Sequence, residues 1–195
     1  MFIILKGYGI YMERTVEKQG FPYHIFLIGF MGSGKSSVAQ ELSKQLGIEA
    51  LEMDAMIVEG QQMAITDIFA KYGEERFRDL ESQLLIDLQQ RDPAVISCGG
   101  GVVLRPENTG HMKKHGRVVL LTATPQTIYE RVKDSTERPI LNQNMSVEFI
   151  EGLMEKRRAK YLAAADYVIA TDGKELDAIC EEILQTLQDS NCTEK

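Results

Sequence analysis

The sequence predicts an α/β fold, a three-layer sandwich built on a five-stranded parallel sheet. Apolar runs of strand length alternate with helical repeats of apolar residues, and several of the runs end at glycine. Alternating strands and helices form right-handed βαβ units, whose sheet is parallel and covered on both faces. Ligands of such sheets bind at the carboxyl ends of the strands, so we expect the chemistry at that edge.

Each element follows from a local pattern. Strands are expected at five apolar segments: His24–Ile28, Ala50–Met53, Ala94–Cys98, Arg117–Thr122 and Tyr167–Ala170. Helices are expected where apolar residues recur every three or four positions: Ser36–Leu46, Glu74–Gln89, Thr127–Val132, Val147–Tyr161 and Leu176–Leu187. The segment Asp134–Ser146 has no periodicity, which indicates either a functional lid or a disordered loop.

Composition limits the classes of protein that the chain can belong to. Its 195 residues favour one domain, expected at 21–190 after an N-terminal extension over 1–20. Lys and Arg number 22 against 29 Asp and Glu, and the net charge of −7 argues against a nucleic-acid partner. Apolar stretches are too short for a membrane partner, and apolar heptads are lacking, so we expect a monomer. The three cysteines suit neither a disulfide framework nor a metal site, which favours the cytoplasm.

A phosphate-binding loop is the most specific motif. Gly29–Ser36, GFMGSGKS, matches the P-loop (Walker A) pattern G-x-x-x-x-G-K-[ST], after an expected strand and before an expected helix. Glycines let the backbone turn N–H groups toward phosphate oxygens, Lys35 supplies a mobile positive charge, and the Ser36 hydroxyl can bind Mg²⁺. Nucleotide contacts are expected from six residues: Gly32, Ser33, Gly34, Lys35, Ser36 and Ser37. The chain is therefore expected to be a nucleotide-binding enzyme or switch.

Polar residues and glycines follow two further expected strands. Glu52 and Asp54 would point the same way in a strand, one toward a metal-bound water and one toward an acceptor hydroxyl, or both simply into solvent. The glycines of Gly99–Gly101 allow a ligand to approach the backbone closely, or form a plain tight turn. Ser97, just before them, is either a second contact for the metal's water or a structural serine.

Three arginine positions fit an anionic substrate, although each can also be an ordinary surface residue. Arg78 lies in the first turn of the helix expected at Glu74–Gln89. Arg138 lies in the unpatterned segment, from which a guanidinium can reach a transferring phosphoryl group. Arg157 and its neighbour Arg158 lie in the basic run EKRRAK.

These motifs together resemble the shikimate kinases, the small P-loop kinases of aromatic amino-acid biosynthesis. The landmarks occur in order as GFMGSGKS, LEMD, DIFAKYGEERFRDLE, VISCGGG, TERPIL and LMEKRRAKY, between His24 and Leu187. The resemblance implies a P-loop NTPase-type, nucleoside-monophosphate-kinase-like fold. It also implies a substrate-binding segment at about 54–82 and a mobile lid at about 134–146.

The resemblance also implies roles for particular residues. Asp54 corresponds to the family's acceptor-hydroxyl aspartate, and Arg78 and Arg157 to the arginines that bind the shikimate carboxylate, with Arg158 as the neighbouring alternative. Arg138 corresponds to the lid arginine that closes on the phosphates, and Arg131 to one that packs against adenine. The glycines of 99–101 would contact shikimate.

One departure concerns the metal site. Glu52 stands where the family usually has an aspartate in the Mg²⁺ water shell, so Glu52 and Ser97 are candidates for metal contact through water beside a direct Ser36 ligand. The implied reaction transfers the γ-phosphoryl group of ATP to the 3-hydroxyl of shikimate, giving shikimate 3-phosphate and ADP. The alternatives are a kinase for another small hydroxy acid such as gluconate, and a noncatalytic nucleotide-binding module.

Overall fold

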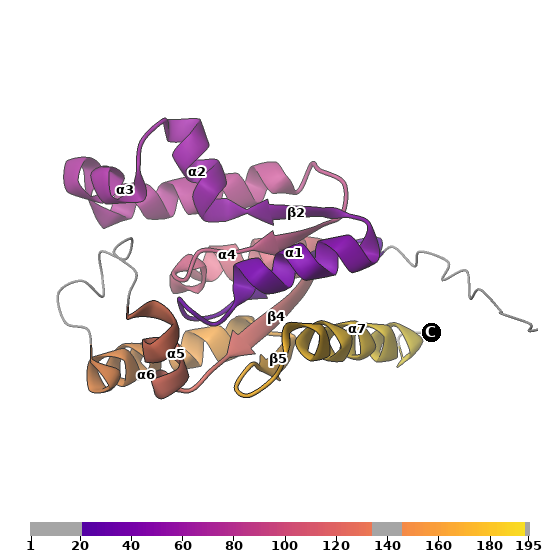
Figure 1. Cartoon of the computed structure of the whole chain (residues 1–195). Coiled ribbons are helices and arrows are strands. Elements are labelled where there is room, and N and C mark those ends of the chain that lie inside the picture. The colour runs from indigo at the N-terminus through magenta and orange to yellow at the C-terminus, as the bar shows by residue number, and fades with distance from the viewer. Residues whose placement is uncertain (1–20, 134–145, 194–195) are drawn as a thin grey trace, which may run out of the picture.

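The computed structural model describes residues 21–133 and 146–193, and its centre is a five-stranded parallel sheet (Figure 1). The strands are β1 (His24–Ile28), β2 (Glu49–Glu52), β3 (Ala94–Ser97), β4 (Gly116–Thr122) and β5 (Tyr167–Ala170). Their order across the sheet is β2-β3-β1-β4-β5, and every neighbouring pair is parallel. The predicted fold class and all five predicted strands are confirmed, with ends shifted by one residue.

Seven α-helices and one short 3-10 helix connect these strands within the described residues. They are α1 (Lys35–Leu46), α2 (Met53–Gln61), α3 (Ile65–Leu88), η1 (Val102–Leu104), α4 (Pro106–His115), α5 (Pro125–Val132), α6 (Val147–Ala164) and α7 (Leu176–Thr193). The sequence did not predict α2, η1 or α4. Among the described residues, no helix combines the length and apolar character needed to cross a membrane.

The two faces of the sheet carry separate cores, because side chains alternate along each strand. One face packs against α1 and α7, with Leu27 of β1, Leu42 of α1 and Ile183 of α7 in one buried cluster. The other face packs against α3, α4 and α6, with Ile28 and Leu85 in the second cluster. This arrangement gives the three layers that the alternating pattern predicts.

Two boundaries differ from the expectation. Strand β2 ends at Glu52 and α2 begins at Met53, so Asp54 lies in the first turn of a helix and not in the strand. Helix α3 begins at Ile65, well before the predicted start, and is interrupted at Gly73, where φ is 80° and ψ is 170°. Arg78 therefore lies in the helical part after this kink, one turn beyond Glu74.

The strand order brings two loops together at the carboxyl edge of the sheet. Strand β1 runs into the P-loop and its neighbour β3 runs into the three glycines. The ladder continues past β3, where the Cys98 N–H donates to the Leu27 carbonyl at 3.0 Å. Helices α2 and α3 lie beside β2 on one side of this edge, while α5 and α6 lie on the opposite side (Figure 1).

Candidate active site

The P-loop adopts the conformation that its glycines predict. Gly29, Gly32 and Gly34 have φ values of 147°, 79° and 97°, a region that only glycine occupies readily. A Cβ at Gly29 would also overlap the Leu121 carbonyl of β4. Gly34 then caps α1, so the positive amino end of this helix faces the loop. The first turn of α1 has no acidic residue that would offset this positive potential. The loop is therefore built to bind an anion.

A cavity of about 480 Å³ opens over the start of α1. It is lined by eleven of the predicted site residues: Gly32, Ser33, Gly34, Lys35, Ser36, Ser37, Glu52, Asp54, Ser97, Gly100 and Arg131. The far wall comes from Thr171, Lys174 and Leu176, around the end of β5. The structure thus brings together the P-loop, both carboxylates and one of the predicted arginines around a volume suited to a nucleotide.

Lys35 and Arg131 supply positive charge to this cavity. The Lys35 ammonium donates to the Gly29 and Phe30 carbonyls at 3.0 and 3.1 Å, so it lies folded over the P-loop. Arg131 donates to the Gly32 carbonyl at 3.2 Å and to the Thr171 hydroxyl at 3.1 Å. It therefore bridges the P-loop and the segment after β5.

Glu52 provides oxygen ligands next to the P-loop serine. Its Oε2 accepts a hydrogen bond from the Ser36 hydroxyl at 3.1 Å, and Ser97 is its neighbour in the β2–β3 register. Burial raises the pKa of Glu52, while the hydroxyls of Ser97 and Ser36 act to lower it. Within the described residues no cluster of three or more His, Cys, Asp or Glu could hold a metal alone. Hydroxyl and carboxylate oxygens fit a hard cation that brings further ligands from a bound phosphate.

The three glycines make room for side chains from other elements. A Cβ at Gly99 would overlap Glu81 Oε1 and lie 2.8 Å from Asp54 Oδ1, and one at Gly101 would overlap the Arg78 guanidinium. A Cβ at Gly100 would meet only the P-loop backbone, at 3.6 Å from the Met31 nitrogen. The glycine run is therefore the meeting point of the P-loop, α2 and α3.

Arg78 is a buried arginine held by two carboxylates. It is 6% exposed, and its Nη1 lies 2.5 Å from Glu81 Oε2 while its Nη2 lies 2.7 Å from Glu74 Oε1. Burial lowers the pKa of Arg78, but Glu81 and Glu74 outweigh burial and raise it overall. For Glu81 burial has the opposite effect and raises the pKa to about 7, although the positive charge of Arg78 acts to lower it.

Sequence reasoning missed Glu81. It lies on the buried face of α3 that Phe77 and Leu85 share, and its side chain is fully buried. An acidic residue inside an apolar stripe, three positions after an arginine, is the signal that could have found it.

The structure distinguishes the two neighbouring arginines of α6. Arg157 is 9% exposed, donates to the Gly100 carbonyl at 3.4 Å and lies over the Phe30 ring with 6.0 Å to its centroid. Arg158 is exposed and pairs with Glu155 at 3.5 Å. Arg157 is thus the one that faces the glycines, whereas Arg138, the predicted lid arginine, lies outside the described residues.

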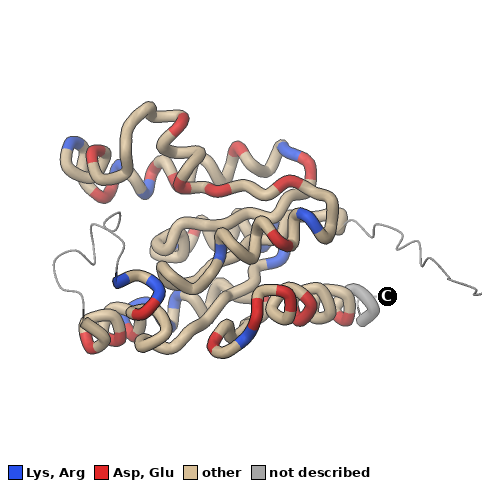
Figure 2. The backbone as a smooth tube through the Cα atoms, viewed as in Figure 1, with Lys and Arg blue, Asp and Glu red and all other residues tan. Residues whose placement is uncertain are grey.

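Charge around the site is local. Acidic residues recur along α7, which has no Lys or Arg, whereas α3 carries both acidic and basic residues (Figure 2). The net charge of −7 therefore cannot attract an anionic substrate. The attraction must come from a few local cations: Lys35, Arg131 and Lys174 at the cavity, and Arg78 and Arg157 at the glycine run.

Comparison with known proteins agrees with this geometry. The shikimate kinase family model matches residues 31–188. A shikimate kinase of Geobacter metallireducens is 40% identical over 174 residues, 89% of this chain and 97% of that protein. The structure of shikimate kinase from Acinetobacter baumannii in complex with shikimate has a TM-score of 0.82 and 30% identity, covering 86% of this chain and 94% of that one.

The shikimate kinase of Aquifex aeolicus has a TM-score of 0.75 and 37% identity, covering 86% of this chain and 98% of that one. Sequence, fold and the order of the site motifs lead to one conclusion. The chain belongs to the shikimate kinase family.

Proposed function

We propose that this kinase transfers the γ-phosphoryl group of ATP to the 3-hydroxyl of shikimate, giving shikimate 3-phosphate and ADP. The observation that carries the proposal is the contact of Asp54 and Arg78 with the glycines of 99–101, beside the P-loop. The proposed proton acceptor and the proposed carboxylate-binding arginine are therefore neighbours of the loop proposed to bind the phosphates. That combination suits a small hydroxy acid as the acceptor.

The P-loop residues hold the donor. Backbone N–H groups and the amino end of α1 bind the phosphates, and Lys35 leaves its carbonyl partners to bind the β- and γ-phosphates. Arg131 and the segment at 171–174 form the wall for the adenine ring. Arg138 is proposed to neutralise the transferring group.

The acceptor is held by its carboxylate and activated at its hydroxyl. Arg78 and Arg157 bind the carboxylate through paired N–H groups, which a lysine could not provide in the same geometry. The hydroxyl oxygen forms the new P–O bond while the bond from the γ-phosphorus to the β,γ-bridging oxygen breaks, and ADP leaves with that oxygen. Asp54 orients the hydroxyl and accepts its proton late in the transfer.

Magnesium is proposed as the cofactor. Ser36 would ligate it directly, with Glu52 and Ser97 as water-mediated contacts, and the ion would neutralise phosphate charge when bound.

We further propose that the kinase acts as a cytoplasmic monomer. The cysteines of the described residues, Cys98 and Cys180, are both free.

Release of ADP tests the reaction and the substrate together. Purified protein with MgATP is expected to release ADP when shikimate is added, and to release little with gluconate or without an acceptor. Release only with gluconate would keep the reaction class and reject the substrate. Absence of release with every acceptor, despite measured ATP binding, would reject the kinase proposal in favour of nucleotide binding alone.

Two matched pairs of variants test the assigned roles. Asp54→Asn should lower kcat far more than it raises the KM for shikimate, while Glu59→Gln, on the same helix but exposed, should change neither. Lys35→Ala should abolish turnover, while Lys44→Ala, 73% exposed near the end of α1, should not. A raised KM with an unchanged kcat in Asp54→Asn would make that carboxylate a binding group only.

A further inference from the structure

The Gly100 carbonyl accepts two hydrogen bonds from one face of α6. Tyr161 donates its hydroxyl at 2.5 Å, and Arg157, one helical turn earlier, donates Nη1 at 3.4 Å. The first contact is at the short end of the normal range for a hydroxyl donor, whereas the second is near the outer limit of a hydrogen bond. The carbonyl is thus held firmly by Tyr161 and weakly by Arg157.

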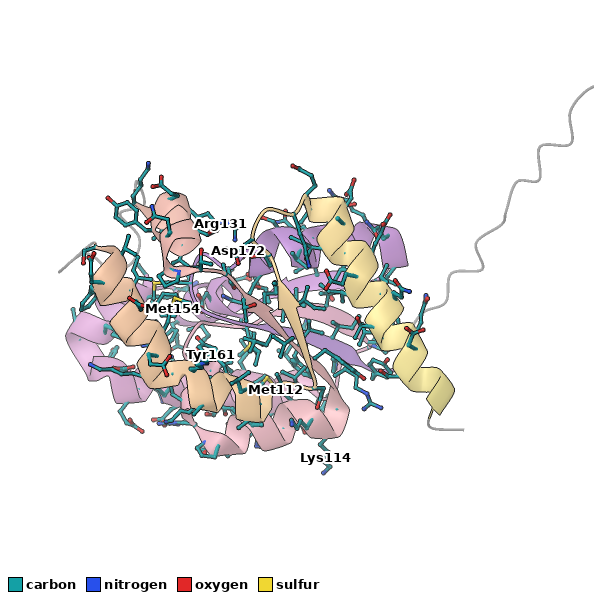
Figure 3. The ribbon with its side chains drawn as sticks, turned by 90° about the horizontal axis from the view of Figure 1, so that it is seen from below. Met112, Lys114, Arg131, Met154, Tyr161 and Asp172 are labelled. Atoms are coloured by element: carbon teal, nitrogen blue, oxygen red, sulfur yellow. The ribbon has the colours of Figure 1, made fainter. Side chains whose placement is uncertain are left out.

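Tyr161 is built into the core. It is 5% exposed and belongs to the buried cluster that includes Ile96, Cys98 and Val102. Figure 3 shows Tyr161 on α6. Burial raises the pKa of the Tyr161 hydroxyl to about 12, so the hydroxyl keeps its proton and remains a donor at neutral pH. Lys160 adds a second tie from α6, donating to the Leu104 carbonyl at 3.0 Å.

Arg157 has a different task in the proposed reaction. A guanidinium binds a carboxylate best through two parallel N–H groups, and an N–H directed at a carbonyl is not available for that pair. Arg157 has five N–H groups, but turning two of them toward the acceptor carboxylate is expected to break the 3.4 Å contact between Nη1 and the Gly100 carbonyl. A carbonyl that loses its donor inside a site pays a desolvation penalty, unless a second donor remains.

We infer that Tyr161 is a positioning residue for the acceptor: it satisfies the Gly100 carbonyl so that Arg157 can turn to the acceptor carboxylate. The inference rests on the role that the proposed function gives to Arg157. Gly100 also lies close to the P-loop, since a Cβ added to it would be 3.6 Å from the Met31 nitrogen. The hydrogen bond from Tyr161 helps to keep Gly100 in this place. The acceptor loop thus keeps its place when Arg157 moves.

The test is calorimetric binding of shikimate and, separately, of ADP to Tyr161→Phe. This variant keeps the ring in the core and removes the hydroxyl, which donates to Gly100 and also hydrogen-bonds with the Arg157 side chain. The shikimate Kd is expected to rise about three- to tenfold, the range of one net hydrogen bond, while the ADP Kd stays the same. Tyr167→Phe on β5, half-buried against the other core, is the matched control and should change neither.

A double-variant cycle separates positioning from simple packing. When Arg157→Ala has removed the guanidinium, adding Tyr161→Phe should weaken shikimate binding no further. Additive effects, or an equal loss of shikimate and ADP affinity together with a lower melting temperature, would overturn the inference. An unchanged shikimate Kd in Tyr161→Phe alone would also overturn it.

The same measurements show which proposal has failed. Shikimate binding to the wild-type chain and its measurable weakening in Arg157→Ala test the proposed function, and failure of either rejects the inference as well. If both hold and Tyr161→Phe binds shikimate normally, only the role of Tyr161 is rejected.

Discussion

Glu52 is the carboxylate nearest to the proposed cation ligand Ser36. It ends β2 with its carboxylate reaching the Ser36 hydroxyl, the group that the P-loop motif assigns to the cation. A carboxylate at this position adds negative charge and fixes the orientation of the serine. Both effects strengthen cation binding when a nucleotide supplies the remaining ligands.

Removing that charge should weaken the metal and spare the nucleotide. In Glu52→Gln we expect the affinity of the ADP complex for Mn²⁺ to fall about tenfold, as for other groups that orient a metal ligand. Spin resonance of free Mn²⁺ measures this without turnover. Glu49→Gln, an exposed change in the same strand, is the control, and equal Mn²⁺ affinity in both variants would contradict the assignment.

The two carboxylates of Arg78 offer a second residue-scale comparison. Glu81 is fully buried, whereas the Glu74 side chain is 54% exposed. Removing Glu81 would leave the buried Arg78 charge with the exposed Glu74 as its remaining carboxylate, and breaking a buried pair typically costs about 3–5 kcal/mol. An exposed partner contributes about 1 kcal/mol or less, since water screens it.

We therefore expect Glu81→Ala to lower the free energy of unfolding by about 3–5 kcal/mol and Glu74→Ala by about 1 kcal/mol or less. Urea unfolding of the two variants gives both numbers. Similar losses of unfolding free energy in the two variants would mean that Glu81 is not the main partner that stabilises the Arg78 charge.

Site residues that belong to one continuous motif are predictable from the sequence. A residue such as Glu81, whose role depends on how helices pack, is not. The P-loop residues act through a local motif, so their sequence is enough to find them. Glu81 is different, because an acidic residue on a helix is expected to face solvent. Only the packing of α3 against the glycines shows that its partner Arg78 is buried too.

At the scale of elements, segments with a regular apolar repeat are predictable from the sequence, and short segments without such a repeat are not. Helices α1 and α7 and the second part of α3 follow from their apolar repeats, and the strands follow from their apolar runs. Helix α4 begins at a proline and buries only Asn108 and Met112, so its sequence carries little helical signal. Helix α2 follows β2 without a turn residue, which is why the strand was extended to Met53.

His24 joins three elements at the amino edge of the sheet. Its ring accepts a hydrogen bond from the Ala94 N–H of β3 at 3.2 Å and contacts the Leu88 carbonyl at the end of α3 at 3.1 Å. Burial lowers the pKa of His24 from 6.5, and the Leu88 carbonyl offsets only part of this effect. The contact with Ala94 needs an unprotonated ring nitrogen.

Stability should therefore depend on pH through His24. The unfolded chain binds a proton near pH 6.5 and the folded chain only at lower pH, so the unfolded state binds more protons between the two values. This contribution is complete above pH 6.5 and is lost as pH falls through the folded pKa, with a slope of at most about 1.4 kcal/mol per pH unit. Urea unfolding from pH 5 to 7.5 should show a shallower slope in His24→Gln, and parallel slopes would contradict the prediction.

At the scale of the whole molecule, the cavity links most of the sheet. Its walls come from the ends of β2 and β3, from the segments that follow β1 and β5, and from Arg131 of α5. Unfolding of any of these elements destroys the site. A ligand that binds only the folded chain therefore stabilises the whole domain.

ADP at a hundred times its Kd should stabilise the chain by about 2.7 kcal/mol, which for this length raises the melting temperature by about 5–10 °C. Scanning calorimetry at the same ADP concentration should give a smaller rise in Lys35→Ala and an undiminished rise in Lys44→Ala. An equal rise in both variants would place the nucleotide away from the P-loop.

The pairing of β1 with β3 has a consequence for the reach of the reaction. The P-loop and the glycine run at 99–101 leave the sheet from adjacent strands. The backbone hydrogen bond from the Cys98 N–H to the Leu27 carbonyl still joins these strands at that point. Adjacent strands are about 4.8 Å apart, a length that side-chain substitutions hardly change. The backbone of the fold therefore sets the separation between the P-loop and the glycine run. Evolution can then exchange the groups that recognise the acceptor while the transfer distance stays the same.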